Sequence, residues 1–120
     1  MGFKKYRGPD KYHFRVYKTS VGHPFIVVAV TEEKSENGKT LISGYMMTTS
    51  LQRMLDKPAS YKRLVVNPNP NDERPSFVNK FRLTDIPAKK FSKPYTKWHL
   101  SKDDERLIDA LEAKFAKHHP

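Results

Sequence analysis

Apolar residues in this chain gather in short runs, and these runs predict a mostly β protein. The clearest run covers residues 25–30, whose continuous apolar and largely β-branched character is typical of a buried strand. The Asn37-Gly38 dipeptide favours a turn, so we expect residues 25–30 to form a hairpin with residues 41–48. Further strands are expected over residues 14–17, 63–66 and 77–86.

The C-terminal segment has the spacing of a helix. Ser101 can cap its first turn, where three acidic residues meet the positive end of the helix dipole. Its apolar positions share one face: Leu107, Ile108, Leu111 and Phe115. About five short strands and one terminal helix predict an α+β domain that is mostly β, built as a small barrel or a strongly bent sheet.

The length of 120 residues suits a single domain. Residues 1–12 are polar and basic and are predicted to be an N-terminal arm, followed by one domain over residues 13–120. The absence of cysteine excludes disulfides and cysteine-based zinc sites. Because no segment has the apolar length of a signal peptide or of a membrane span, we expect a cytoplasmic protein with no membrane contact.

The net charge is the sequence feature that says most about the partner. The chain carries 23 Lys and Arg against 13 Asp and Glu, a formal net charge of +10. Such a balance favours a polyanionic partner, above all a nucleic acid. Residues 101–120 hold four cations and five anions, so the basic surface is expected outside the terminal helix.

Two short segments could carry chemistry. Thr48, Thr49 and Ser50 end a predicted strand, where their hydroxyls could donate to phosphate oxygens or simply cap neighbouring backbone. His23 precedes the buried strand, and histidine is the usual acid or base near neutral pH, although a lone histidine can equally be a packed residue. No Gly-rich phosphate loop, zinc-binding motif or carboxylate pair is present, so the sequence predicts no cofactor and no metal.

Cations and aromatic rings alternate near the predicted strand ends, a pattern that suits phosphate contact and base stacking. Most of these rings could instead belong to the core, and Tyr17 and Phe81 in particular are expected to be buried. The side chains predicted to contact RNA are Arg15, Tyr45, Thr48, Arg53, Lys62 and Arg63.

Four segments, taken in order, carry a resemblance to a known family. They are residues 23–28 (HPFIVV), 48–50 (TTS), 77–86 (FVNKFRLTDI) and 100–111 (LSKDDERLIDAL). Their order resembles the MazF/PemK/Kid toxins, metal-independent endoribonucleases with an SH3-like barrel, and more distantly the ToxN branch. The chain departs from the family where His23 replaces the usual Arg before Pro, and where Leu83-Thr84-Asp85-Ile86 replaces Arg-Thr-Ile-Asp.

The resemblance implies a small SH3-like barrel of about five strands and a toxin–antitoxin role. It implies cleavage of single-stranded RNA by its own 2′-hydroxyl, in a homodimer inhibited by an antitoxin, which could be a protein or an RNA. The residues to which it assigns catalysis are His23, Thr49, Ser50, Lys80 and Arg82. Two alternatives stay open: a non-catalytic nucleic-acid-binding barrel, and a protein-interaction module for an acidic partner.

Overall fold

The computed structural model describes residues 3–7, 14–20, 22–34 and 40–118, and the side chains of all of these except residues 3–7 and 32–34. The strands are β1 (Phe3–Arg7), β2 (Val16–Thr19), β3 (Pro24–Lys34), β4 (Thr40–Thr48), β5 (Tyr61–Arg63), β6 (Phe77–Asn79), β7 (Leu83–Pro87) and β8 (Phe91–Pro94). The helices are α1 (Leu51–Asp56), α2 (Lys102–His118) and the short 3₁₀ helices η1 (Pro58–Ser60) and η2 (Ala88–Lys90). The predicted fold class, mostly β with a C-terminal helix, is confirmed.

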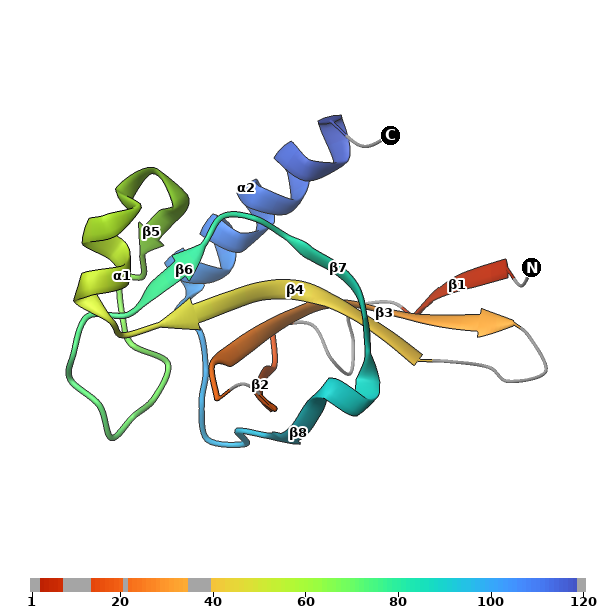
Figure 1. Cartoon of the computed structure of the whole chain (residues 1–120), viewed down its shortest axis with the longest axis horizontal. Coiled ribbons are helices and arrows are strands. Elements are labelled where there is room, and N and C mark those ends of the chain that lie inside the picture. Colours follow the sequence, from red (N-terminus) through yellow and green to blue (C-terminus); the bar gives the residue numbers. More distant parts are fainter. Residues whose placement is uncertain (1–2, 8–13, 21, 35–39, 119–120) are drawn as a thin grey trace.

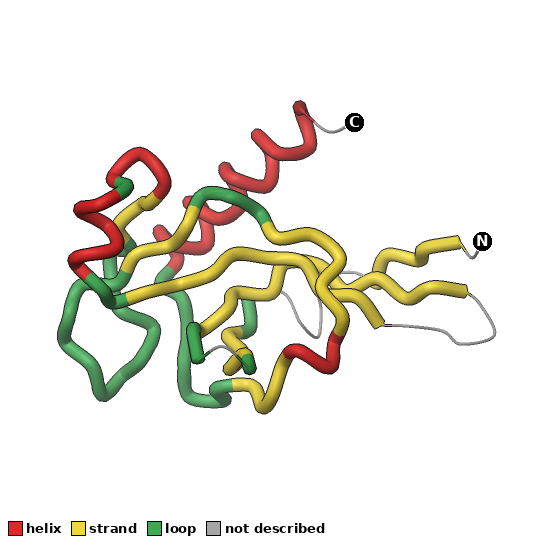
Figure 2. The backbone as a smooth tube through the Cα atoms, viewed as in Figure 1, coloured by secondary structure: helices red, strands yellow, loops and turns green. Residues whose placement is uncertain are grey.

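The two long strands β3 and β4 form the spine of a strongly bent antiparallel sheet (Figures 1 and 2). Each long strand changes partner along its length. β3 pairs first with β2 and then with β1, and β4 pairs with β7 near its start and with β6 at its end. Strands β5 and β8 lie at the two ends of the path β5-β6-β4-β3-β2-β8. This bend brings chain segments that are distant in sequence to the same edge of the sheet.

Close approach of β3 and β4 requires a glycine. A Cβ at Gly44 would collide with the carbonyl oxygen of Ile26 and lie 2.7 Å from a ring carbon of Phe25. The β3–β4 register shifts between Val27 and Ala29, beside this contact. Only glycine lets the two backbones meet here.

The continuous apolar run of β3 is explained by cores on both of its faces. Ile26 and Val28 belong to one cluster, into which Ile108 of α2 packs. Phe25 and Val27 belong to a second cluster, covered by Phe91 of β8 among others. Both faces of β3 are therefore buried over residues 25–30, the run that the sequence pattern predicted to be a buried strand.

Helix α2 is tied to the sheet by a buried carboxylate. Asp104 is 1% exposed and accepts hydrogen bonds from the backbone N–H groups of Val65 at 2.8 Å and Val66 at 3.2 Å. The Ser101 hydroxyl accepts the Asp104 N–H at 3.1 Å, so the predicted cap is confirmed. This anchor fixes the chain that leads into the loop before β6.

Several sequence-based expectations need correction. The predicted strand over residues 77–86 is two strands, β6 and β7, and β8 was not predicted. Phe81, expected to be buried, lies between β6 and β7 and is 66% exposed, whereas Tyr17 is half-buried against Phe91. Residues 3–7 of the expected N-terminal arm pair with β3, and the Asn37-Gly38 turn lies outside the described residues.

No helix in the described part of the chain is long and apolar enough to cross a membrane.

Candidate functional site

A cavity of about 440 Å³ opens where β3 begins and β4 ends. Hydroxyl, amide, imidazole and guanidinium groups meet in it, and two aromatic rings close one side. We call it the hydroxyl cavity. Its lining includes His23, Thr48, Thr49, Ser50, Asn67, Asn69, Asp72, Arg74, Ser76, Tyr95 and Trp98.

The antiparallel pairing of β3 and β4 brings His23 to the hydroxyl triplet. Phe25 faces Met46 across the ladder, so the residue before β3 and the residues after β4 fall at the same edge. The carbonyl of His23 accepts a hydrogen bond from the Thr19 hydroxyl at 2.8 Å, and Gly22 supplies the positive φ of 85° that the turn before it requires. His23 is thereby held at the cavity wall.

Two of the three hydroxyls also have local structural roles. Ser50 caps α1 by accepting the Arg53 N–H at 3.2 Å, and the Thr48 hydroxyl accepts the Ser50 N–H at 3.0 Å. The capping interpretation is therefore correct for both. A hydroxyl that accepts still has its own proton to donate, so both groups keep a donor for a bound anion. Thr49 makes no side-chain hydrogen bond to another described residue.

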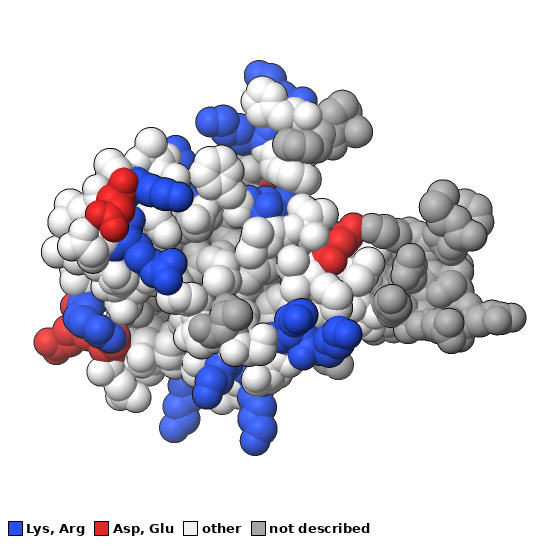
Figure 3. Space-filling model, viewed as in Figure 1, with Lys and Arg blue, Asp and Glu red and all other residues white. Residues whose placement is uncertain are grey.

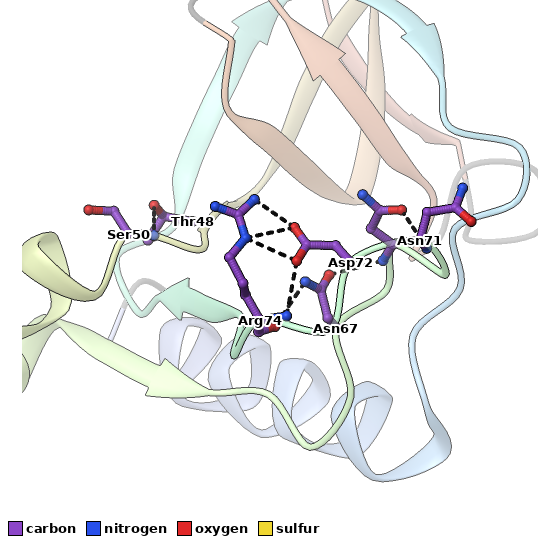
Figure 4. Close-up of polar contacts among 7 residues, drawn as sticks. Thr48, Ser50, Asn67, Asn71, Asp72 and Arg74 are labelled. Atoms are coloured by element: carbon purple, nitrogen blue, oxygen red, sulfur yellow. Dashed lines mark hydrogen bonds and ion pairs between the residues drawn. The ribbon is translucent and has the colours of Figure 1, made fainter.

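The loop between β5 and β6 forms the opposite wall and is stiffened by its own side chains. The side-chain Oδ1 of Asn67 accepts the backbone N–H of Asn69, and Oδ1 of Asn69 accepts the backbone N–H of Asn71, each at 3.0 Å. The Asn67 amide donates to the carbonyl of Arg74 at 3.0 Å, which closes the loop (Figure 4). These Asx-type bonds preorganise the loop without regular secondary structure.

Arg74 is held in this wall by a bidentate pair with Asp72. Its Nη2 lies 2.7 Å from Oδ2 and its Nε lies 3.0 Å from Oδ1 of the carboxylate. The hydrogen bonds from Arg74 lower the pKa of Asp72 to about 2, and those to Asp72 raise the pKa of Arg74. The Arg74 side chain remains 69% exposed, against 14% for Asp72, so the guanidinium can still meet a ligand. Figure 4 shows Thr48 and Ser50 beyond it, at the end of β4.

Ser76 adds an unpaired group to the lining. It is 1% exposed, and its hydroxyl has no hydrogen-bond partner among the described residues. Buried hydroxyls are nearly always paired, and an unpaired one that lines a cavity is available to a ligand.

Lys80 and Arg82 do not join this cavity. Both line a separate groove of about 360 Å³ against the C-terminal half of α2, which we call the α2 groove. The Arg82 Nε donates to Oε1 of Glu112 at 2.7 Å, and the guanidinium carbon lies 4.5 Å from the ring centre of Phe115. Arg82 therefore binds α2 to the β6–β7 connection. The single groove expected for all five catalytic candidates holds three of them: His23, Thr49 and Ser50.

Tyr45, predicted to contact RNA, is instead a core residue. It is fully buried and its hydroxyl donates to Oε1 of Glu112 at 2.7 Å. Burial, followed by the bond to Glu112, raises the pKa of its phenol. A side chain in this position has no surface to offer a ligand, so this prediction is wrong.

The other predicted RNA contacts lie on the surface or in the cavity. Thr48 lines the hydroxyl cavity, and Arg53 lines a small neighbouring hollow that also includes His23. Arg15 lines a separate cavity of about 250 Å³, and Lys62 and Arg63 are exposed on β5. In Figure 3 the visible Lys and Arg side chains form separate groups near α1, near β8 and on the far end of α2, and acidic side chains lie beside the group near α1.

The second wall of the site, formed by the loop over residues 67–74, was not predicted from the sequence, and neither were Tyr95 and Trp98. The available signal was the Asn-Pro-Asn-Pro-Asn-Asp run, whose repeated turn-forming side chains precede Arg74 and Ser76. Sequence alone could not show that this loop faces the end of β4.

Comparison with known proteins identifies no relative. No family model matches the chain, and no curated protein and no solved structure is significantly similar to it. Within the described residues, no cluster of three or more His, Asp or Glu side chains is placed to hold a metal ion.

Proposed function

We propose that this protein is a metal-independent endoribonuclease that binds single-stranded RNA in the hydroxyl cavity. One observation carries the proposal: His23, the Thr49 and Ser50 hydroxyls and Arg74 come from three distant parts of the chain and line the same cavity. These groups can supply a proton shuttle, neutral donors and a fixed cation. The net charge of +10 supports a polyanionic substrate.

The chemistry is internal transfer of a phosphodiester. The 2′-oxygen attacks phosphorus and its proton passes to a base; the bond from phosphorus to the 5′-oxygen breaks, and an acid protonates that oxygen. The products are a 2′,3′-cyclic phosphate and a 5′-hydroxyl. His23 is assigned the acid or base role, and Arg74 and the two hydroxyls stabilise the charge that develops on the phosphoryl oxygens.

The resemblance to the MazF/PemK/Kid toxins supports the same activity, and with it a homodimer and an antitoxin partner. In the family-like assignment Lys80 or Arg82 would stabilise the transition state. Because both line the α2 groove, the proposal gives that role to Arg74.

A second candidate is a nucleic-acid-binding protein that does not cleave. The observation in its favour is the bidentate Asp72, which compensates the charge of Arg74 within the cavity. A site with one compensated cation would hold a strand more readily than it would stabilise a transition state.

Incubation with mixed-sequence RNA in EDTA separates the two candidates. The endoribonuclease is expected to yield fragments with 2′,3′-cyclic phosphate ends, and His23→Ala is expected to cut at least about a hundredfold more slowly while still binding RNA. Arg106→Gln is the control for a substitution outside the site, because Arg106 is exposed and does not line the hydroxyl cavity. Binding with no cleavage above the His23→Ala level would leave the second candidate.

A further inference from the structure

Tyr95 and Trp98 form a stacked pair that separates two cavities. Their ring centres are 4.0 Å apart and their planes differ by 12°. Both rings line the hydroxyl cavity, and both also line a second cavity of about 250 Å³ that includes Arg15, His99 and Glu105. We call this second space the Arg15 cavity.

The backbone holds this stack in a fixed position. The Tyr95 N–H donates to the carbonyl of Val16 in β2 at 2.8 Å, and the Trp98 N–H donates to the carbonyl of Tyr95 at 3.1 Å. Both rings are half-buried against the core cluster that contains Ile108. A rigid, partly exposed aromatic wall loses little freedom when a flat ligand stacks on it.

We propose that the Tyr95–Trp98 stack is a nucleobase platform and that the Arg15 cavity is a second nucleotide subsite on the same strand. This inference rests on the proposed function, because the strand it describes is the RNA held in the hydroxyl cavity. The substrate is then a single strand of at least two nucleotides, since paired bases cannot leave their own stack to reach the rings.

The charges of the Arg15 cavity orient that nucleotide. Arg15 is exposed and can reach a phosphate, whereas the half-buried Glu105 carboxylate repels one. Glu105 has no hydrogen bond from its side chain to another described residue, so it can accept from the N–H groups on a base edge. The base therefore lies toward Glu105 and the rings, and its phosphate lies toward Arg15.

Tryptophan fluorescence reports binding at the platform, because Trp98 is the only tryptophan in the chain. The unaltered protein is titrated with a short 2′-O-methyl oligonucleotide, which has no free 2′-hydroxyl and cannot be cleaved. Tryptophan emission and the anisotropy of a dye on the oligonucleotide are followed together. We expect saturable quenching with the same midpoint as the anisotropy change, and loss of quenching when one nucleotide of the oligonucleotide is made abasic.

Variants extend the test beyond the platform. Arg15→Gln is expected to weaken binding of the oligonucleotide several-fold, because it removes the cation that meets the phosphate of the second nucleotide. Lys89→Gln is the charge-matched control, since Lys89 is exposed on η2 and does not line either cavity. Both substitutions are on the surface, so folding is expected to survive them.

The outcomes separate this inference from the proposed function. Quenching without any RNA cleavage would keep the platform and remove the endoribonuclease. Anisotropy binding with unchanged emission, or equal quenching by every abasic oligonucleotide, would overturn the platform even if RNA is cut. No binding by either signal would overturn both.

Discussion

Substitutions of Asp72 and Arg74 should change RNA affinity in opposite directions. Asp72 holds the guanidinium from the side of the loop and adds a negative charge to the cavity. Asp72→Asn removes that charge. It keeps a side-chain oxygen that can accept the backbone N–H of Arg74, which Oδ1 of Asp72 accepts at 2.9 Å. The freed guanidinium should then bind phosphate more strongly. Arg74→Gln removes the cation and leaves the carboxylate of Asp72 facing the RNA.

The magnitude follows from the exposure of the pair. The Arg74 side chain is 69% exposed, so its attraction to a phosphate is close to the value in water, about 1 kcal/mol at contact, rather than the larger value of a buried site. Arg74→Gln should therefore weaken binding about five- to tenfold, and Asp72→Asn should strengthen it by about the same factor. Each cation lost should also lower the slope of log affinity against log salt by about 0.7 for a single strand.

Anisotropy titrations of a 2′-O-methyl oligonucleotide at several salt concentrations measure both quantities. Arg106→Gln controls for the general loss of one positive charge, because Arg106 is as exposed as Arg74 and also pairs with an aspartate, Asp103, outside the hydroxyl cavity. Surface pairs contribute little to stability, so thermal unfolding of all three variants should stay close to that of the parent protein. Weaker binding by Asp72→Asn, or equal losses in Arg74→Gln and Arg106→Gln, would refute the reasoning.

Four further predictions, on three variants, concern the frame that positions the site. Tyr45→Phe should lower the free energy of unfolding by about 1–2 kcal/mol through loss of the bond to Glu112, with RNA affinity unchanged in a parallel titration. Burial raises the pKa of Tyr45 above its ordinary value of 10.0, so its phenol ionises at a lower pH in the unfolded state than in the folded state. In urea unfolding, the free energy of unfolding of the parent protein should therefore fall above about pH 10 more steeply than that of Tyr45→Phe. Asp104→Ala should cost about 3 kcal/mol in the same assay, because two backbone N–H groups lose a buried carboxylate. Gly44→Ala should cost roughly 3 kcal/mol or more, or abolish folding as judged by circular dichroism, because the new Cβ meets the Ile26 carbonyl. A stable Gly44→Ala protein would contradict the described β3–β4 approach.

The part of the site that the sequence predicted depends on local pairing. His23 and the Thr49-Ser50 pair flank two strands that form a hairpin, and antiparallel register alone places them together. Their convergence could therefore be inferred from the hydrophobic pattern without knowledge of the rest of the fold.

The misplaced residues depend on tertiary contacts that no local pattern reveals. Apolar and polar residues alternate over residues 77–86 well enough to suggest one strand. However, β6 ends at Asn79, and Asp85 adopts a positive φ of 56°. Arg82 is then drawn to Glu112, thirty positions along the chain and on another element. Charge density indicated a cation for the site but not which one, and the choice of Arg74 follows only from the folded loop.

The most direct test of the account is an amide chemical-shift map of the labelled protein titrated with the uncleavable oligonucleotide. The hydroxyl cavity and the α2 groove are both concave and both contain cations, so either could attract RNA. We predict the largest shifts at Thr49, Ser50 and Asn69 and at the indole N–H of Trp98. Shifts concentrated instead at Lys80, Phe81 and Lys114 would place the RNA in the α2 groove and contradict the account.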